Sequence, residues 1–113
     1  MSKYKSIKTN GYASKKEYNR SVILKLLEKQ GLISNLKEQV KYELIPAQYQ
    51  LQKIKTGHLK NVCIEKSCSY IADFTYFESG KFIVEDVKGV KTEIYRIKKK
   101  LMLLVHKIII KET

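Results

Sequence analysis

Two neighbouring segments with the side-chain alternation of β-strands constrain this chain most. The first is Ser69–Tyr76 and the second is Lys81–Lys88, and a short turn that contains glycine separates them, so together they predict a hairpin. Strand side chains alternate between faces, so Asp86 and Lys88 project from the same side. Because Asp73 lies in the first strand, we expect two carboxylates and a lysine to converge at the end of the hairpin.

Length and composition limit the rest of the fold. The chain has 113 residues, of which 43% are hydrophobic, so we expect one compact domain over residues 13–113 preceded by a flexible basic arm at residues 1–12. The formal net charge of +12 favours a polyanionic partner, with nucleic acid ahead of a membrane surface. No stretch approaches the roughly 20 apolar residues of a spanning helix, and no apolar signal core follows the basic start, so we expect an intracellular protein.

Helix and strand signals flank the hairpin. Ser14 and Glu17 form a capping box that predicts a helix over residues 15–30. Alternation predicts a strand over residues 36–45, which ends before Pro46. Residues 46–67 are polar and fit either an extra hairpin or a mobile loop.

The second half predicts a helix and a final strand. Thr92 is a good helix N-cap, and apolar residues then recur at helical spacing at Ile94, Ile97, Leu101 and Leu104. The run 107–111 predicts a last short strand, buried on both sides. A crossover helix usually joins parallel strands. The predicted fold class is therefore α/β, in the order α-β-β-β-α-β, with a mixed four-stranded sheet flanked by helices.

The predicted cluster suits phosphodiester hydrolysis assisted by a divalent cation. Mg²⁺ prefers oxygen ligands, typically one or two carboxylates together with water and substrate phosphate. Asp73 and Asp86 can provide the carboxylates, the Val87 carbonyl is close in sequence, and Lys88 can orient water or balance the charge of the phosphate. Glu17 is a third candidate carboxylate.

Each of these residues also has a simpler interpretation. Glu17 is the acid that a capping box requires, Asp73 could face solvent, and Asp86 with Lys88 could form a solvated edge. Glu85 points to the opposite face in a regular strand but becomes a rival ligand if a β-bulge intervenes. Near His58, two cysteines occur with irregular spacing, which favours ordinary reduced thiols over a zinc site.

The chain resembles the PD-(D/E)XK nuclease superfamily, in which Asp73 and then Asp86-Val87-Lys88 lie on successive strands behind a helix that carries Glu17. The closer resemblance is to the small phage and prophage proteins of the DUF1064 family. It rests on three stretches, which are Ser14-Lys15-Lys16-Glu17, Tyr42-Glu43-Leu44-Ile45-Pro46-Ala47-Gln48, and the second half from Tyr70-Ile71-Ala72-Asp73-Phe74 through Val84-Glu85-Asp86-Val87-Lys88-Gly89 and Lys91-Thr92 to Lys98-Lys99-Lys100-Leu101.

This resemblance implies a restriction-endonuclease-like core and a role for each site residue. The residues implied to hold Mg²⁺ or Mn²⁺ are Asp73, Asp86, Val87 and Glu17. The implied catalytic lysine is Lys88. Ala72 stands where the superfamily often has proline before the first aspartate.

The surface and the resemblance together suggest a partner and a function. Lys91, Arg96 and Lys99 are candidates for holding a DNA backbone, although such runs are usually solvated helix faces. We expect a metal-dependent endonuclease for double-stranded or branched DNA, in particular a Holliday-junction resolvase of phage recombination, replication or packaging. It would act in the bacterial cytoplasm and could be a homodimer. The alternatives are a non-catalytic DNA-binding protein on a nuclease fold and a basic partner of another phage protein.

Overall fold

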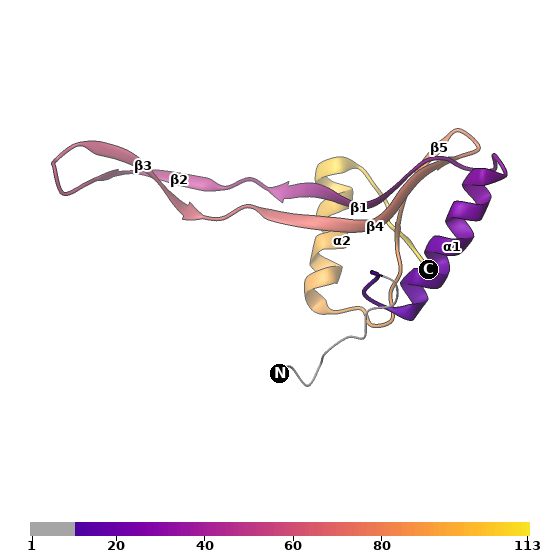
Figure 1. The fold of residues 1–113 in the computed structure, drawn as a ribbon. Coiled ribbons are helices and arrows are strands. Elements are labelled where there is room, and N and C mark those ends of the chain that lie inside the picture. The colour runs from indigo at the N-terminus through magenta and orange to yellow at the C-terminus, as the bar shows by residue number, and fades with distance from the viewer. Residues whose placement is uncertain (1–10) are drawn as a thin grey trace.

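A four-stranded mixed sheet with two helices forms the body of the molecule, and a two-stranded ribbon projects from it (Figure 1). The structure is a computed structural model that describes residues 11–113, so most of the expected arm at residues 1–12 lies outside it. The elements are α1 (Lys15–Lys29), β1 (Ser34–Ile45), β2 (Gln48–Lys53), β3 (Leu59–Glu65), β4 (Cys68–Glu78), β5 (Lys81–Asp86), α2 (Glu93–His106) and β6 (Lys111–Glu112).

Helix α1 begins where the capping signal predicts. The Ser14 hydroxyl accepts a hydrogen bond from the Glu17 N–H at 3.1 Å, which satisfies one of the amide groups left free at a helix start. The helix ends before Gly31, whose φ of +78° is easy only for glycine. The Leu24 side chain of α1 is fully buried against the sheet and anchors the helix there.

The strand order β1-β4-β5-β6 confirms the predicted mixed sheet. β1, β4 and β5 pair antiparallel, while β6 pairs parallel with β5 after the α2 crossover. The predicted final strand at residues 107–111 is wrong, because β6 covers only Lys111–Glu112. Lys107 takes a left-handed conformation and caps α2, so the chain is still leaving the helix there, and pairing starts only where Lys111 meets Glu85.

The two helices cover different faces of the sheet through two hydrophobic clusters. Ile83 packs with the cluster under α1, and its neighbour Val84 packs with the cluster under α2. In β4, however, Ala72 belongs to the α2 cluster and Phe74 to the α1 cluster, although residues two apart share a face in a regular strand. The side-chain alternation of β4 therefore reverses at Asp73, so that Ala72 and Phe74 lie on opposite faces of the sheet. We call this reversal the change of facing. The β1 residue beside this point, Gln39, has a left-handed φ of 55°, which locates the same irregularity in the partner strand.

Helix α2 is present as predicted, but its apolar stripe does not form the core. Tyr95 and Met102 are the buried residues, while Ile94, Ile97 and Leu104 are each more than half exposed. The Tyr95 hydroxyl donates to Glu112 at 2.7 Å, and this bond to β6 helps to set the rotation of the helix. Within residues 11–113, no helix is long and apolar enough to cross a membrane.

Residues 46–67 form the hairpin that was one of the two sequence interpretations. β2 and β3 pair with each other as a separate two-stranded sheet, which we call the ribbon, defined as residues 48–65. Pro46 and Ala47 separate β2 from β1, and proline lacks the N–H that would continue the ladder. The ribbon extends the line of β1 and β4 away from both helices (Figure 1).

Candidate metal site

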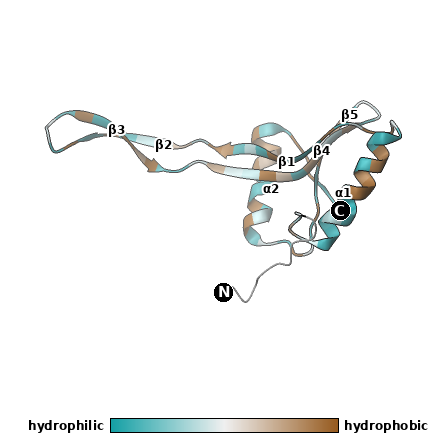
Figure 2. Cartoon of the chain, viewed as in Figure 1, coloured by the Kyte–Doolittle hydropathy of each residue, from teal (hydrophilic) through white to brown (hydrophobic). Residues whose placement is uncertain are grey.

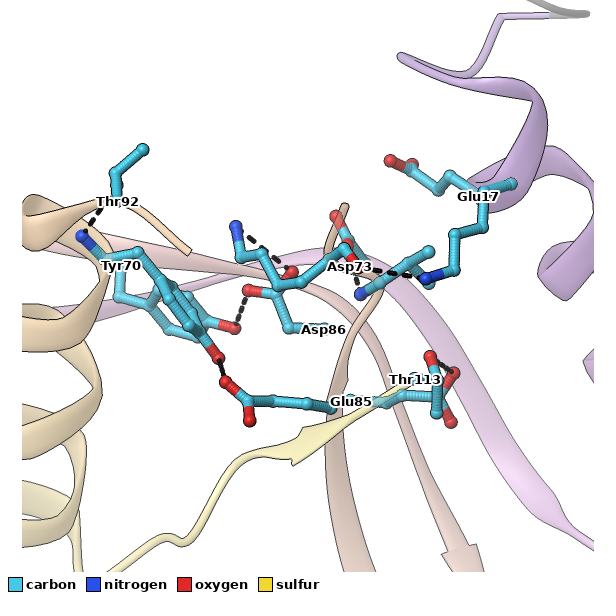
Figure 3. Close-up of polar contacts among 12 residues, drawn as sticks. Glu17, Tyr70, Asp73, Glu85, Asp86, Thr92 and Thr113 are labelled. Carbon is cyan, nitrogen blue, oxygen red and sulfur yellow. Dashed lines mark hydrogen bonds and ion pairs between the residues drawn. The ribbon is translucent and has the colours of Figure 1, made fainter. Parts of the chain in front are cut away.

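Acidic side chains from three elements meet beside one groove. Glu17 comes from the first turn of α1, Asp73 from the middle of β4, and Asp86 from the last position of β5 (Figure 3). They line a cavity of about 580 Å³ together with Lys88 and Tyr95. Asp73 and Asp86 are the only two aspartates in the chain, so both lie at this groove.

Asp86 is buried and held at both carboxylate oxygens. The Tyr70 hydroxyl donates to its Oδ2, and the Lys88 Nζ lies 3.4 Å from its Oδ1. The Lys88 ammonium also stands 4.3 Å from the centre of the Tyr95 ring, close enough for a cation–π contact. Asp86 and Lys88 therefore lie together, as the alternation of strand side chains indicates.

Asp73 is held against the end of β5 by the backbone. Its Oδ2 accepts a hydrogen bond from the Val87 N–H at 2.8 Å, which favours the ionised carboxylate. Burial, however, raises the pKa of Asp73 well above its ordinary value, and the neighbouring Asp86 carboxylate raises it further. Two carboxylates held this close repel each other unless a cation or a proton lies between them.

Ser14 caps α1, and Glu17 contributes only its backbone N–H to this cap, so its carboxylate lies in the groove. Its Oε2 accepts a hydrogen bond from the Gln39 side chain at 3.2 Å. Burial raises the pKa of Glu17, and the charge of Asp86 is the next largest cause. The interpretations as a cap and as a groove carboxylate are therefore compatible in geometry.

Glu85 lies on the other face of β5 and is not a member of this cluster. It is fully buried, and Arg20 binds it through two hydrogen bonds of 2.6 and 2.9 Å. The hydroxyls of Tyr76 and Thr113 also donate to it. Burial raises the pKa of Glu85, but these donors outweigh burial and hold it below its usual range. Glu85 thus fastens α1 to the sheet instead of competing for a metal.

The donor set suits a hard cation that keeps most of its water. Within residues 11–113, no three His, Cys, Asp or Glu side chains are grouped closely enough to enclose a metal ion. Mg²⁺ does not need such a cage, since one or two carboxylates plus water and substrate phosphate complete its octahedron. Asp73 and Asp86 fit that requirement, with the Val87 carbonyl following directly in the chain.

Both cysteines are free thiols, Cys63 exposed and Cys68 half-buried.

The structure does not bring the candidate DNA-backbone residues into the groove. Lys91 and Lys99 each lie 3.2 Å from Glu112 Oε1, so part of their charge is balanced. Arg96 and Lys99 line a different depression, at the outer side of α2. Lys98, which the sequence did not single out for this role, lines the groove instead.

Two neighbours of the cluster were not identified from the sequence. Tyr70 reaches Asp86 only because the facing of β4 changes at Asp73, and no sequence pattern signals that change. Lys16 donates to the Lys88 carbonyl at 2.9 Å, which ties the start of α1 to the loop after β5. That contact joins residues far apart in the sequence, and spacing alone cannot indicate it.

Comparison with known proteins identifies a family. No curated protein and no solved structure matches the chain. A family model described as "Protein of unknown function (DUF1064)" matches residues 1–110, which is nearly the whole length. The chain therefore belongs to the DUF1064 family.

Proposed function

We propose that this protein is an endonuclease that hydrolyses phosphodiester bonds in DNA with Mg²⁺ or Mn²⁺, on a restriction-endonuclease-like core of the PD-(D/E)XK type. The observation that carries the proposal is the pair Asp73 and Asp86, pressed together in a groove with Lys88 beside Asp86. Two neighbouring carboxylates, Asp86 buried and Asp73 half-buried, favour a cation between them, and for a chain of net charge +12 a polyanion is the natural substrate.

Each residue has a distinct task in this proposal. Asp73 and Asp86 would hold the cation, and Glu17 would hold a water molecule bound to it or add a ligand. A cation bound there would polarise the phosphate and lower the pKa of a bound water. Lys88, held over the Tyr95 ring and beside Asp86, would orient the attacking water or balance the charge of the scissile phosphate. Tyr70 fixes the carboxylate of Asp86 through its hydroxyl.

The substrate proposed is double-stranded or branched DNA, and the leading specific version is a four-way junction in phage recombination, replication or packaging. The groove is lined by backbone and side chains from α1, β4, β5 and α2, so it is an open trough suited to a polymer. Cutting two strands needs two sites, and a homodimer would supply them.

Cleavage assays with supercoiled plasmid and synthetic four-way junctions, in Mg²⁺ or Mn²⁺, test the function. We expect wild-type protein to cut, and Asp86→Ala and Lys88→Ala to lose activity by at least about a hundredfold, the usual scale for removing a group that stabilises the transition state. Glu78→Ala and Lys81→Ala are matched controls, because they remove the same charges at the far end of the β4–β5 hairpin. These controls should cut at the wild-type rate.

Two outcomes would contradict the proposal in different ways. If wild-type protein binds DNA tightly and cuts no substrate in either metal, the protein is a DNA-binding member of the fold without catalysis. If Asp86→Ala cuts as well as wild type, the chemistry lies elsewhere in the molecule.

A further inference from the structure

The ribbon is the least buried part of the described structure. Every residue of β2 is exposed, and in β3 only Val62 is half-buried. A lone two-stranded hairpin is marginally stable in water. The body of the protein covers almost none of the ribbon, so a partner would supply the contacts that the ribbon lacks.

The charge of the ribbon indicates the kind of partner. Lys53, Lys55 and Lys60 surround its turn, and its one acidic residue, Glu65, lies at the opposite end, at the base. Elsewhere Lys88, Lys91 and Lys99 form ion pairs, whereas none of the three turn lysines pairs with an acid within residues 11–113. Unbalanced positive charge on a projecting element favours a polyanion and opposes a second copy of the same element.

The two faces of the ribbon carry different chemistry (Figure 2 shows hydrophobic and hydrophilic residues along it). Gln50 pairs with Val62 and Gln52 with Lys60, so two amides and an ammonium share one face. The Gln52 amide donates to the Gln50 carbonyl oxygen at 3.0 Å, which aligns the two side chains. The opposite face carries Tyr49, Leu51 and Leu59, each about 60% exposed.

The ribbon also adjoins the candidate metal site. Its second strand leads, through only Lys66 and Ser67, into β4, and Ser69 and Tyr70 at the start of β4 already line the groove. A long polymer lying in the groove would therefore meet the base of the ribbon.

We propose that the ribbon binds duplex DNA by lying in its major groove, with the Gln50, Gln52 and Lys60 face toward the bases and Lys53 and Lys55 near the phosphates. The inference deepens the proposed function, because it takes DNA as the substrate of the adjoining site. It adds the ribbon to the DNA-backbone candidates Lys91, Arg96 and Lys99 that the sequence suggests.

The dimensions and chemistry agree with this placement. A two-stranded ribbon fits the major groove of B-DNA, which is about 12 Å wide. Six residues of β2 span about 20 Å, or roughly six base pairs. Glutamine amides bond adenine edges and lysine bonds guanine edges, so this face carries donors and acceptors that match base edges.

Binding measured without cleavage separates the inference from the proposed function. Fluorescence anisotropy with labelled duplexes and four-way junctions, in EDTA and over a series of salt concentrations, would compare two triple variants. The first is Lys53→Gln, Lys55→Gln, Lys60→Gln in the ribbon. The control is Lys29→Gln, Lys37→Gln, Lys81→Gln, which removes three exposed lysines at the other end of the molecule and lowers the net charge equally.

The ribbon triple should weaken binding at least about tenfold more than the control triple and reduce the slope of log K against log salt by about 2 to 3, since each lost phosphate contact contributes about 0.9. Equal weakening by the two triples would overturn the inference, because the effect would then be general charge. A second variant, Gln50→Ala with Gln52→Ala, should change the preference among duplexes of different sequence while leaving the salt slope unchanged.

A protein partner for the ribbon is the remaining outcome. Light scattering of Tyr49→Ser, Leu51→Ser, Leu59→Ser measures the mass in solution. If this variant turns a dimer into a monomer and the lysine triple binds DNA like wild type, the ribbon is a subunit contact and the inference is wrong. If the lysine triple loses binding but wild-type protein cuts nothing, the inference stands and the proposed enzymatic function fails.

Discussion

The molecule contains two antiparallel hairpins in opposite environments. The β4–β5 hairpin lies between the two helices, and Phe74 and Glu85 within it are fully buried. The β2–β3 ribbon has a six-residue strand like β5 and a similar ladder, yet almost all of it is exposed. A similar ladder therefore occurs in a buried and in an exposed hairpin, and packing against the helices makes the difference. The buried hairpin has matched polar partners, whereas the exposed ribbon carries unmatched lysines.

The largest stability difference should come from the core of the buried hairpin. Phe74→Ala should lower the free energy of unfolding by about 4 kcal/mol, because it leaves a cavity under α1 at a fully buried position. Urea denaturation followed by circular dichroism measures the change. A loss below about 1 kcal/mol would show that the cluster under α1 is loosely packed.

Breaking the buried ion pair should have the next largest effect. Arg20→Ala leaves the Glu85 charge buried without its main partner, so we expect a loss of about 3 kcal/mol in unfolding free energy. Adding Glu85→Gln to Arg20→Ala should restore part of that loss. If the double variant is less stable than Arg20→Ala, the stranded charge is not the cause.

Removing the N-terminal cap of α2 should give an intermediate loss of stability. The Thr92 hydroxyl accepts a hydrogen bond from the Tyr95 N–H at 3.1 Å. Thr92→Ala should therefore cost about 1 kcal/mol, and Thr92→Ser should restore most of it. Thermal melts of the three proteins compare them, and equal melting temperatures would argue against the cap.

A substitution in the ribbon should change the free energy of unfolding least. Leu51→Ser removes an apolar side chain that is 60% exposed and lies outside both hydrophobic clusters, so stability should change by no more than about 0.5 kcal/mol. The same urea titration measures it. A loss approaching that of Phe74→Ala would mean that the two hairpins are not energetically distinct.

Local signals in the sequence predicted most of the elements. The cap at Ser14, the glycine after α1 and the Thr92 cap each act within a few residues, and the helices begin where those signals occur. The parallel pairing of β5 and β6 followed from the crossover helix between them. The final strand was misplaced because its apolar run was taken for buried strand, whereas Ile109 is 76% exposed, Ile108 is half-buried beside the core and Ile110 alone of the three is buried.

The approach of Asp86 and Lys88 was predicted from strand alternation, although β5 ends at Asp86 and it is the backbone hydrogen bonds of Thr113 with Asp86 and Lys88 that continue the extended line. The packing of Asp73 against Val87 and the contact of Tyr70 with Asp86 depend on a change of facing inside β4, which is a property of the paired strands. The apolar spacing of α2 identified a helix, but Tyr95 and Met102 fix which side is buried. Such long-range contacts cannot be read from the spacing of residues in the sequence.

The change of facing at Asp73 has a consequence for engineering the protein. Because Ala72 packs under α2 and Phe74 under α1, the backbone that carries Asp73 is braced by both hydrophobic clusters at once. We therefore expect repacking beneath either helix to change the position of Asp73 relative to Asp86. Stabilised variants selected by melting temperature alone would therefore drift in the geometry of the carboxylate pair, and each round of selection should be screened for cation binding as well.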